Sequence, residues 1–262
     1  GALTHAMLMS RDIRSKPWRL VMFYGSGNAP LGVVGLVKPT YRPGSLEETI
    51  RLLPEGVGVV PMHAGVRTGD TQEFHDVLRV VEQRVAELAE IGVSAIYVEG
   101  APPGMLMGYD ADHQLARELS ERHSVPVSLA SMAALSALRY LGAQRVIGLS
   151  YVAQEQHDAF GRYLADAGLD VLVFTGIESS FREADRITAE EVRSRCIELV
   201  REYPQADSIY LLGGAWRILR IVEPLEQELG ISVCAGIQAS VWEILKLLGL
   251  KHSIRGYGRL LL

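Results

Sequence analysis

The five-residue stretch IYVEG, residues 96–100, recurs as IYLLG at residues 209–213. Each copy precedes a helix, a strand and a second amphipathic helix, SMAALSALRYLG after the first copy and ASVWEILKLLG after the second. The shared order predicts a chain built from two related halves, although α/β strands also end alike by chance. Ligands of parallel α/β sheets bind at the carboxyl ends of strands, so facing halves would place Gly100 and Gly213 on opposite walls of one cleft.

Apolar runs bounded by Gly or Pro alternate with helical patterns along the chain, which is typical of parallel sheets covered by helices. We expect strands at residues 33–37, 57–61, 95–99, 125–129, 146–149, 171–174, 208–212 and 231–234. The stretch EFHDVLRVVEQRVAELAEIG, residues 73–92, has apolar residues at spacings of three and four before a glycine, so it predicts an amphipathic helix. The fold class is therefore α/β, with two pseudo-symmetric lobes, each a parallel sheet of about four strands flanked by helices, and the active cleft between the lobes.

The chain has 262 residues, enough for one large domain or two smaller ones. We expect residues 32–145 with 238–262 to form the first lobe and residues 146–237 the second. Residues 1–31 are expected to be an N-terminal extension that packs across a neighbouring subunit or lobe. Its first residues, which begin without Met, are expected to be a cloning remnant.

Charge and cysteine content exclude several classes of partner. The net charge is -5 and the sequence has no long basic stretch, which argues against nucleic acid. The two cysteines, Cys196 and Cys234, have neither zinc-ligand nor disulfide-framework spacing, so no metal is expected and a reducing cytoplasm fits best. The apolar run at residues 20–24 is too short for a signal peptide or a membrane span.

Several short motifs occur together in a characteristic order: GLVKP, YVEGAPPGMLMG, SMAALSALRYLGAQRV, GLSYVAQEQ, YLLGGA, IQASVWEILKLLG and GYGRLL. Over residues 32–262 this order resembles the maleate isomerase and arylmalonate decarboxylase branch of the aspartate/glutamate/hydantoin racemase superfamily. The resemblance implies a cofactor-independent enzyme that acts on a small carboxylate in the cleft between two lobes. We also expect a homodimer or higher homo-oligomer and no cofactor.

The same resemblance exposes a departure at the family's cysteines. Racemases of the superfamily use one cysteine from each lobe as an acid/base pair, and arylmalonate decarboxylases keep the second as a proton donor. Those positions fall at Gly100 and Gly213 here. Cys196 lies within a helix and Cys234 closes a strand, and packing is the ordinary interpretation of both. A mechanism without cysteine is the resulting hypothesis.

Candidate catalytic residues are Glu99 and Tyr151. Glu99 ends the first repeated strand beside a glycine turn, where a carboxylate shielded from water could act as a base, whereas a salt bridge is the structural alternative. Tyr151 matches a tyrosine that faces substrate in the family. Gly213 and Gly214 are expected to open a helix whose free N–H groups bind a carboxylate. Gly100 and Ala101 face them, although the prolines after Ala101 leave fewer N–H groups there.

Further substrate-binding candidates follow other strands. The resemblance and the location at strand ends together point to Thr40, Ser131 and Gln238, with an N-cap role open for Ser131. The stretches KPTYRPG and PMHAGVRTGD follow the first two strands and carry Lys38, Tyr41, Arg42, His63 and Arg67. Because arginine binds carboxylates bidentately, we expect these two stretches to determine which substrate is bound, notably through His63 and Arg67. Solvation at the surface explains Arg42 and Arg67 equally well.

Three classes of function remain open at this point. The first is an isomerase, racemase or decarboxylase-like enzyme that handles a small carboxylate without cysteine. The second is a hydrolase or lyase of a catabolic pathway on the same scaffold, and the third is a non-catalytic protein that binds a small molecule. Fold alone does not choose among them, because function belongs to the site.

Overall fold

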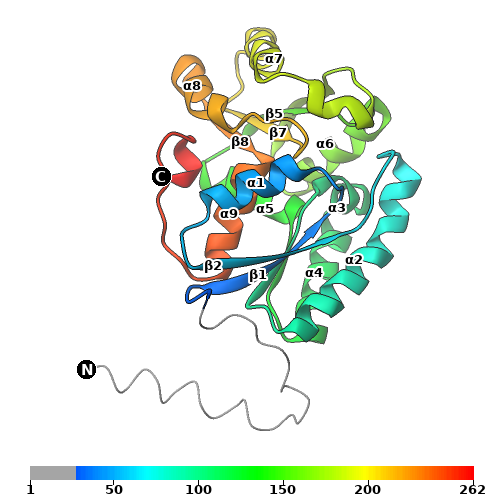
Figure 1. Cartoon of the computed structure of the whole chain (residues 1–262). Helices are drawn as coiled ribbons and strands as arrows, with labels where there is room; N and C mark the ends of the chain where they lie inside the picture. Colours follow the sequence, from blue (N-terminus) through cyan, green and yellow to red (C-terminus); the bar gives the residue numbers. More distant parts are fainter. Residues whose placement is uncertain (1–27) are drawn as a thin grey trace.

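The computed structural model describes residues 28–262, which form two parallel sheets with helices between and around them (Figure 1). The expectation of an N-terminal arm therefore lies almost wholly outside the described residues. In the first sheet the strand order is β2-β1-β3-β4, and in the second it is β6-β5-β7-β8. The two orders are the same when counted within each half, so the predicted α/β class with two pseudo-symmetric lobes is confirmed.

The strands of both sheets lie close to their predicted positions. The first sheet holds β1 (Gly32–Lys38), β2 (Val57–His63), β3 (Ala95–Val98) and β4 (Val127–Leu129). The second holds β5 (Arg145–Ser150), β6 (Asp170–Gly176), β7 (Ser208–Leu212) and β8 (Ser232–Ala235). The repeated stretches form β3 and β7, which occupy equivalent places in the two sheets. The carboxyl ends of β3 and β7 both point toward the region between the lobes.

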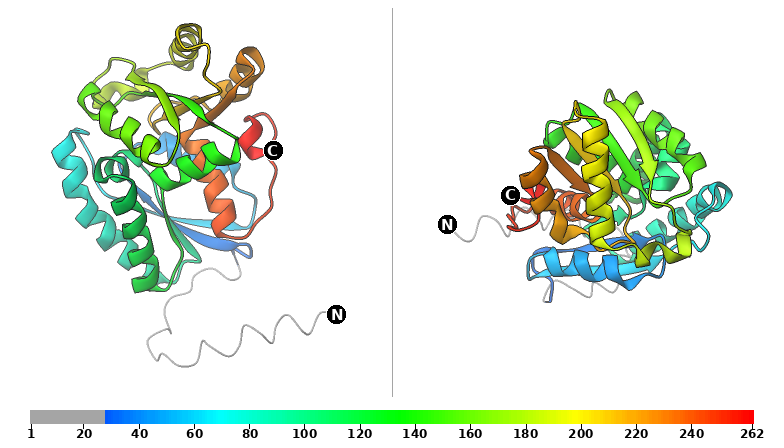
Figure 2. Two further views of the ribbon diagram at one scale, coloured as in Figure 1. Left: turned by 180° about the vertical axis from the view of Figure 1, so that it is seen from behind. Right: turned by 90° about the horizontal axis from the view of Figure 1, so that it is seen from above.

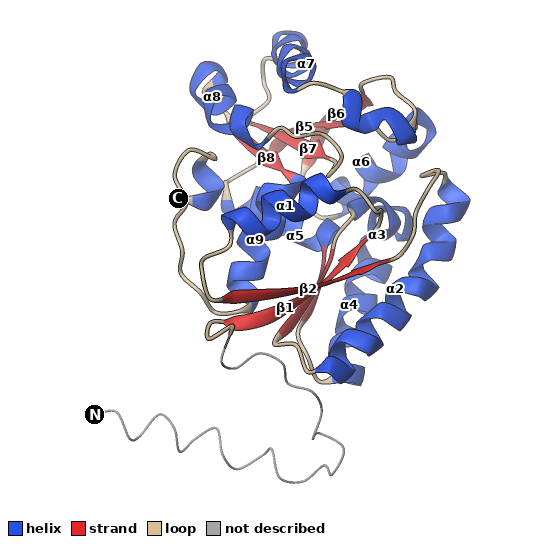
Figure 3. Cartoon of the chain, in the orientation of Figure 1, coloured by secondary structure: helices blue, strands red, loops and turns tan. Residues whose placement is uncertain are grey.

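The helices form layers around the sheets (Figure 3). α1 (Pro43–Leu52), α5 (Ala130–Tyr140) and α9 (Gly236–Leu247) lie between the two sheets. α2 (Thr71–Ile91) and α4 (Tyr109–His123) cover the other face of the first sheet, and α7 (Ala189–Glu202) and α8 (Leu219–Leu229) cover the second sheet from outside. The short α3 (Ala101–Met107) follows β3, and α6 (His157–Asp166) packs beside β6.

Local sequence explains where α2, the longest of these helices, begins and ends. The side chain of Asp70 accepts a hydrogen bond from the backbone N–H of Glu73, which caps the first turn. Gly92 ends the helix with φ of 86°, a left-handed conformation that glycine adopts without strain. The buried residues Val81, Val85 and Leu88 form one stripe facing the first sheet. The predicted amphipathic helix is therefore present.

A shared core holds the two lobes together. One hydrophobic cluster runs from the first sheet through α5 and α9 into the second sheet, and a smaller cluster lies under α2 and α4. Figure 2 shows α9 from behind, enclosed between the lobes. This core fixes how the carboxyl ends of β3 and β7 face each other. Within residues 28–262 no helix is long and apolar enough to cross a membrane.

Candidate active site

A cavity lies between the lobes at the carboxyl ends of the strands. Its volume is ≈ 60 Å³, which is room for about four water molecules. Both lobes contribute to its walls, and its lining is mostly apolar. The predicted site residues that line it are Thr40, Glu99, Gly100, Ala101, Tyr151, Gly213 and Gly214.

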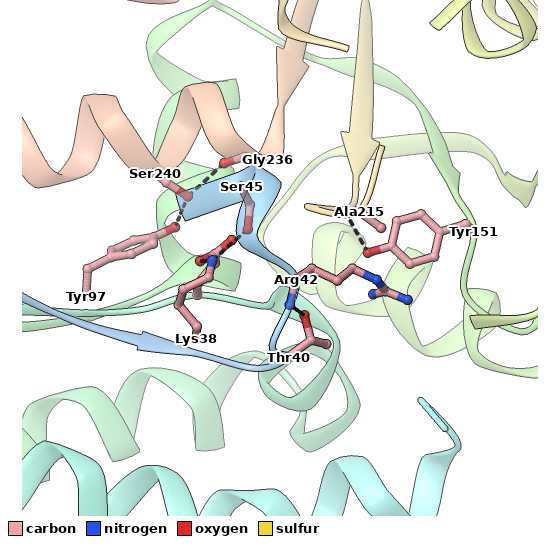
Figure 4. A network of polar contacts seen from close by, with 10 residues as sticks. Lys38, Thr40, Arg42, Ser45, Tyr97, Tyr151, Ala215, Gly236 and Ser240 are labelled. Atoms are coloured by element: carbon pink, nitrogen blue, oxygen red, sulfur yellow. Dashed lines mark hydrogen bonds and ion pairs between the residues drawn. The ribbon is translucent and has the colours of Figure 1, made fainter. Parts of the chain in front are cut away.

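Beneath one wall, Lys38 and Glu99 form a buried ion pair. Lys38 is the last residue of β1, and Glu99 directly follows β3. Lys38 Nζ donates to Glu99 Oε2 and also to Ser45 Oγ, at 2.6 Å (Figure 4). The pairing follows from the sheet register, because Val37 lies opposite Val98 and the next residues are then neighbours. The salt bridge named as the structural alternative for Glu99 is present.

The second oxygen of Glu99 faces the opposite lobe. A Cβ atom placed on Gly214 would lie 3.1 Å from Glu99 Oε1, so this oxygen lies close to a glycine of the second lobe. Oε2 is held by Lys38, and Glu99 is one of the residues that line the cavity. A carboxylate that is held in place at the edge of a cleft is positioned as a general base needs to be.

Arg42 of the first lobe and Tyr151 of the second bring a cation and a hydroxyl together at the cavity. Tyr151 is buried, and its hydroxyl accepts a hydrogen bond from the N–H of Ala215 at 3.2 Å. Burial raises the pKa of Tyr151, and the charge of Arg42 opposes this rise, as expected for a guanidinium nearby. Figure 4 shows the Arg42 side chain extending toward Tyr151. A protonated phenol and a guanidinium at one point form a site suited to a carboxylate.

Arg42 also contacts the loop after β6. Its guanidinium donates to the carbonyl oxygen of Phe181 and lies 4.7 Å from the centre of the Phe181 ring. The ring of Phe181, in turn, packs against Gly69 and Phe74 of the first lobe. The loop therefore closes one side of the cavity across the two lobes.

Gly100 and Gly213, where the resemblance places the family's cysteines, have little room for a side chain. Gly100 has φ of 96°, and a Cβ there would lie 3.0 Å from Pro39 Cγ. At Gly213 φ is 153°, and a Cβ would overlap Cε1 of the Tyr151 ring and lie 2.9 Å from Trp216 Nε1. Such contacts require a shift of the neighbouring side chains. The cleft is therefore built around the absence of side chains at these two positions.

The two cysteines lie outside the cavity. Both thiols are buried, and burial raises the pKa of Cys196 and of Cys234 to about 12. Since the thiolate is the reactive form, these thiols are poor nucleophiles. Within the described residues no group of three His, Cys, Asp or Glu side chains is placed to hold a metal ion.

The turn after β7 differs from its prediction. Gly213 and Gly214 do not open a helix, because α8 begins only at Leu219. The intervening residues form an irregular segment in which Ala215 donates to Tyr151 and the Trp216 side chain is buried. This irregular segment stands where a helix N-terminus was expected, so the helix-terminus site expected for a carboxylate is not formed by Gly213 and Gly214.

Four predicted substrate-binding residues lie outside the cavity lining. Ser131 donates to Asp112 Oδ2 at 2.7 Å in the interior, and Gln238 donates to the carbonyl of Tyr257 at 2.7 Å, which fastens the C-terminal segment. His63 ends β2 beside Lys38 and stacks on Tyr41, and its pKa is lowered by burial and by the charge of Lys38. Arg67 is exposed on the surface.

Sequence reasoning missed Ser45 and Phe181 in the cavity lining, whereas Arg42 lay in a stretch where substrate choice was expected. One usable signal was a lysine ending the apolar strand GVVGLVK, since a charge there needs a partner. Phe181 carries no such signal, because its contacts depend on the loop path after β6.

The family of the chain follows from comparisons with known proteins. The model of the arylmalonate decarboxylase family matches residues 34–261. Arylmalonate decarboxylase of Bordetella bronchiseptica is 25% identical over 229 residues, covering 80% of this chain and 94% of that protein.

Two solved structures share the fold. A liganded variant of arylmalonate decarboxylase superposes with a TM-score of 0.81 at 21% identity, covering 88% of this chain and 98% of the other. The maleate cis-trans isomerase of Nocardia farcinica superposes with a TM-score of 0.81 at 22% identity, covering 88% of this chain and 97% of the other. These findings confirm the resemblance noted from the motifs: the fold is shared with a maleate isomerase, and the chain belongs to the arylmalonate decarboxylase family.

Proposed function

We propose that this protein is an enzyme that moves a proton at the carbon next to the carboxylate of a small organic acid, without a catalytic cysteine. The substrate class is supported by the family, whose relatives include a maleate isomerase solved with maleate. Another isomerase carries a covalently bound succinylcysteine intermediate, so that relative uses a cysteine. This chain has glycine where the resemblance puts both family cysteines.

The observation that carries the proposal is the position of Glu99. Glu99 lines the cavity with Oε1 next to Gly214, while Lys38 holds Oε2. As general base, Glu99 takes the proton from the substrate carbon, and the electron pair left behind is delocalised into the substrate carboxylate. Return of the proton from Glu99 restores the base. General bases of this kind contribute about 10²–10⁴-fold to the rate.

Arg42 and Tyr151 stabilise the charge that develops on the carboxylate. The guanidinium supplies a positive charge, and the phenol has a hydrogen to donate because its oxygen already accepts from Ala215. Its raised pKa keeps the phenol protonated at neutral pH. The base thus comes from the first lobe, and the two stabilising groups come from one lobe each.

The proposal also includes the setting in which the enzyme works. We place it in a reducing cytoplasm, supported by the two free, buried cysteines, and expect a homodimer or higher homo-oligomer that needs no cofactor. These statements rest on the family resemblance and on composition.

Hydrogen exchange in D₂O tests the proposal directly. The protein is incubated with a panel of small carboxylic acids, and replacement of the α-hydrogen by deuterium is followed by proton NMR. We expect exchange to be at least about a hundredfold slower with Glu99→Gln and unchanged with Glu90→Gln, which alters an exposed carboxylate on α2. Equal exchange by wild type and Glu99→Gln excludes Glu99 as the base.

A further inference from the structure

The charge balance of the cavity constrains which acid it can hold. Among the described residues that line it, Arg42 and Glu99 carry charge. Glu99 is compensated by Lys38, which is 1% exposed and is itself anchored by Ser45. The positive charge left for a ligand is therefore that of Arg42, equal to one carboxylate.

A second carboxylate would meet an unfavourable neighbour. Arg42 and Glu99 both lie near Tyr151, since the charges of both act on its phenol, and Glu99 Oε1 lies next to Gly214. A ligand with two carboxylates that places one near Arg42 brings the other toward this oxygen. Like charges at such separations, partly removed from water, repel each other strongly.

The remaining lining favours an apolar substituent. Phe74, Val152, Phe181, Leu212 and Ile237 contribute side chains to the walls. Ala101, Pro102 and Pro103, at the start of α3, lack side-chain hydrogen-bond donors that a second carboxylate would need. This apolar part of the lining is therefore suited to a ring or an alkyl chain.

We infer that the ligand of this cleft is a monocarboxylate with an apolar substituent, and that Glu99 discriminates against dicarboxylates. This inference rests on the proposed carboxylate site and adds the class of acid that the site accepts. Phenylacetate and phenylmalonate are a matched pair of probes, because they differ by one carboxylate on the same carbon.

Calorimetric titration at pH 8, where both carboxyl groups of phenylmalonate are ionised, tests the inference without turnover. We expect phenylacetate to bind the wild-type protein at least about tenfold more tightly than phenylmalonate. The double variant Lys38→Met/Glu99→Gln keeps the pair neutral but removes the negative oxygen, so the difference between the two acids should shrink. Arg42→Met should weaken phenylacetate binding at least about tenfold, while the exposed Lys251→Met should not.

Each possible result has a distinct meaning. Equal or tighter binding of phenylmalonate by the wild type overturns the inference and leaves the carboxylate site standing. An unchanged preference in the double variant overturns the role of Glu99 in discrimination. Failure of both acids to bind overturns the inference and the proposed function together.

Discussion

Lys38 and Glu99, 61 residues apart in the chain, form an ion pair at the carboxyl ends of two adjacent strands, with 1% and 8% of their side-chain surfaces exposed. His63, at the end of β2, lies next to Lys38 on its other side. Three ionisable residues thus form a row across the first sheet below the cavity. The pair serves two purposes that mutation can separate, stability and the placement of Glu99 Oε1.

Removing one member of the pair should destabilise the protein more than removing both. Breaking a buried ion pair costs about 3–5 kcal/mol because one charge is left without a partner. We therefore expect Lys38→Met and Glu99→Gln each to lower the free energy of unfolding by about this amount, and the double variant to lose much less than the sum. Urea denaturation of the three variants measures the coupling.

Catalysis should follow a different pattern from stability. The double variant recovers stability, but it lacks the base, so its hydrogen exchange should stay at least about a hundredfold below wild type. A stable double variant with wild-type exchange would show that Glu99 is only part of the scaffold.

Replacing both cysteines should leave activity nearly unchanged. Cys196→Ser/Cys234→Ser is expected to keep turnover within about tenfold of wild type, a barrier change near 1.4 kcal/mol. Both thiols are buried with raised pKa values, so iodoacetamide at modest concentration should not inactivate the enzyme. Loss of activity in a normally folded double variant would contradict the mechanism without cysteine.

The fold was predictable from sequence because its determinants are local. Apolar runs with glycine and proline boundaries gave strand positions within a few residues, and the repeat of IYVEG as IYLLG indicated equivalent strands. The same repeat predicted that Gly100 and Gly213 occupy equivalent positions at the ends of these strands. Both residues line the cavity from opposite lobes.

The polar contacts were not predictable, because they depend on which strands are neighbours. Lys38 contacts Glu99 because β1 lies beside β3 and Val37 is paired with Val98. Ser131 and Gln238 sit near strand ends as expected, yet their side chains turn to interior partners, Asp112 and the backbone of Tyr257. Neighbouring segments decide these orientations, and single-sequence patterns do not encode them.

Acidification should destabilise the protein through His157. Its ring is buried and contacts Ser150 Oγ at 3.0 Å, and burial lowers its pKa below the usual 6.5. The unfolded chain therefore binds this proton at higher pH than the folded protein does, so stability is complete above pH 6.5 and falls as pH decreases below it. The pKa of His63 is also lowered, so its protonation destabilises the folded protein in the same direction.

Urea denaturation at pH 7.5 and 5.5 measures this linkage. His157→Gln should lose less stability between the two pH values than wild type does, whereas the exposed His252→Gln should behave as wild type. An identical pH dependence of wild type and His157→Gln would exclude the buried imidazole as a source of the slope.

Restoring the family's second cysteine should not restore the family's chemistry. In Gly213→Cys the new Cβ would overlap the Tyr151 ring, at a backbone φ of 153° that side chains rarely adopt. We expect the wild type neither to decarboxylate phenylmalonate nor to isomerise maleate at useful rates, and the variant to gain neither activity while losing about 1–3 kcal/mol of stability from overpacking. Gly142→Cys is the matched control, since a Cβ there meets no atom within 4 Å although φ is also positive. Product chromatography with both acids and thermal melts check the two parts, and turnover of either acid by the wild type would show that this cleft performs the family's chemistry without its cysteines.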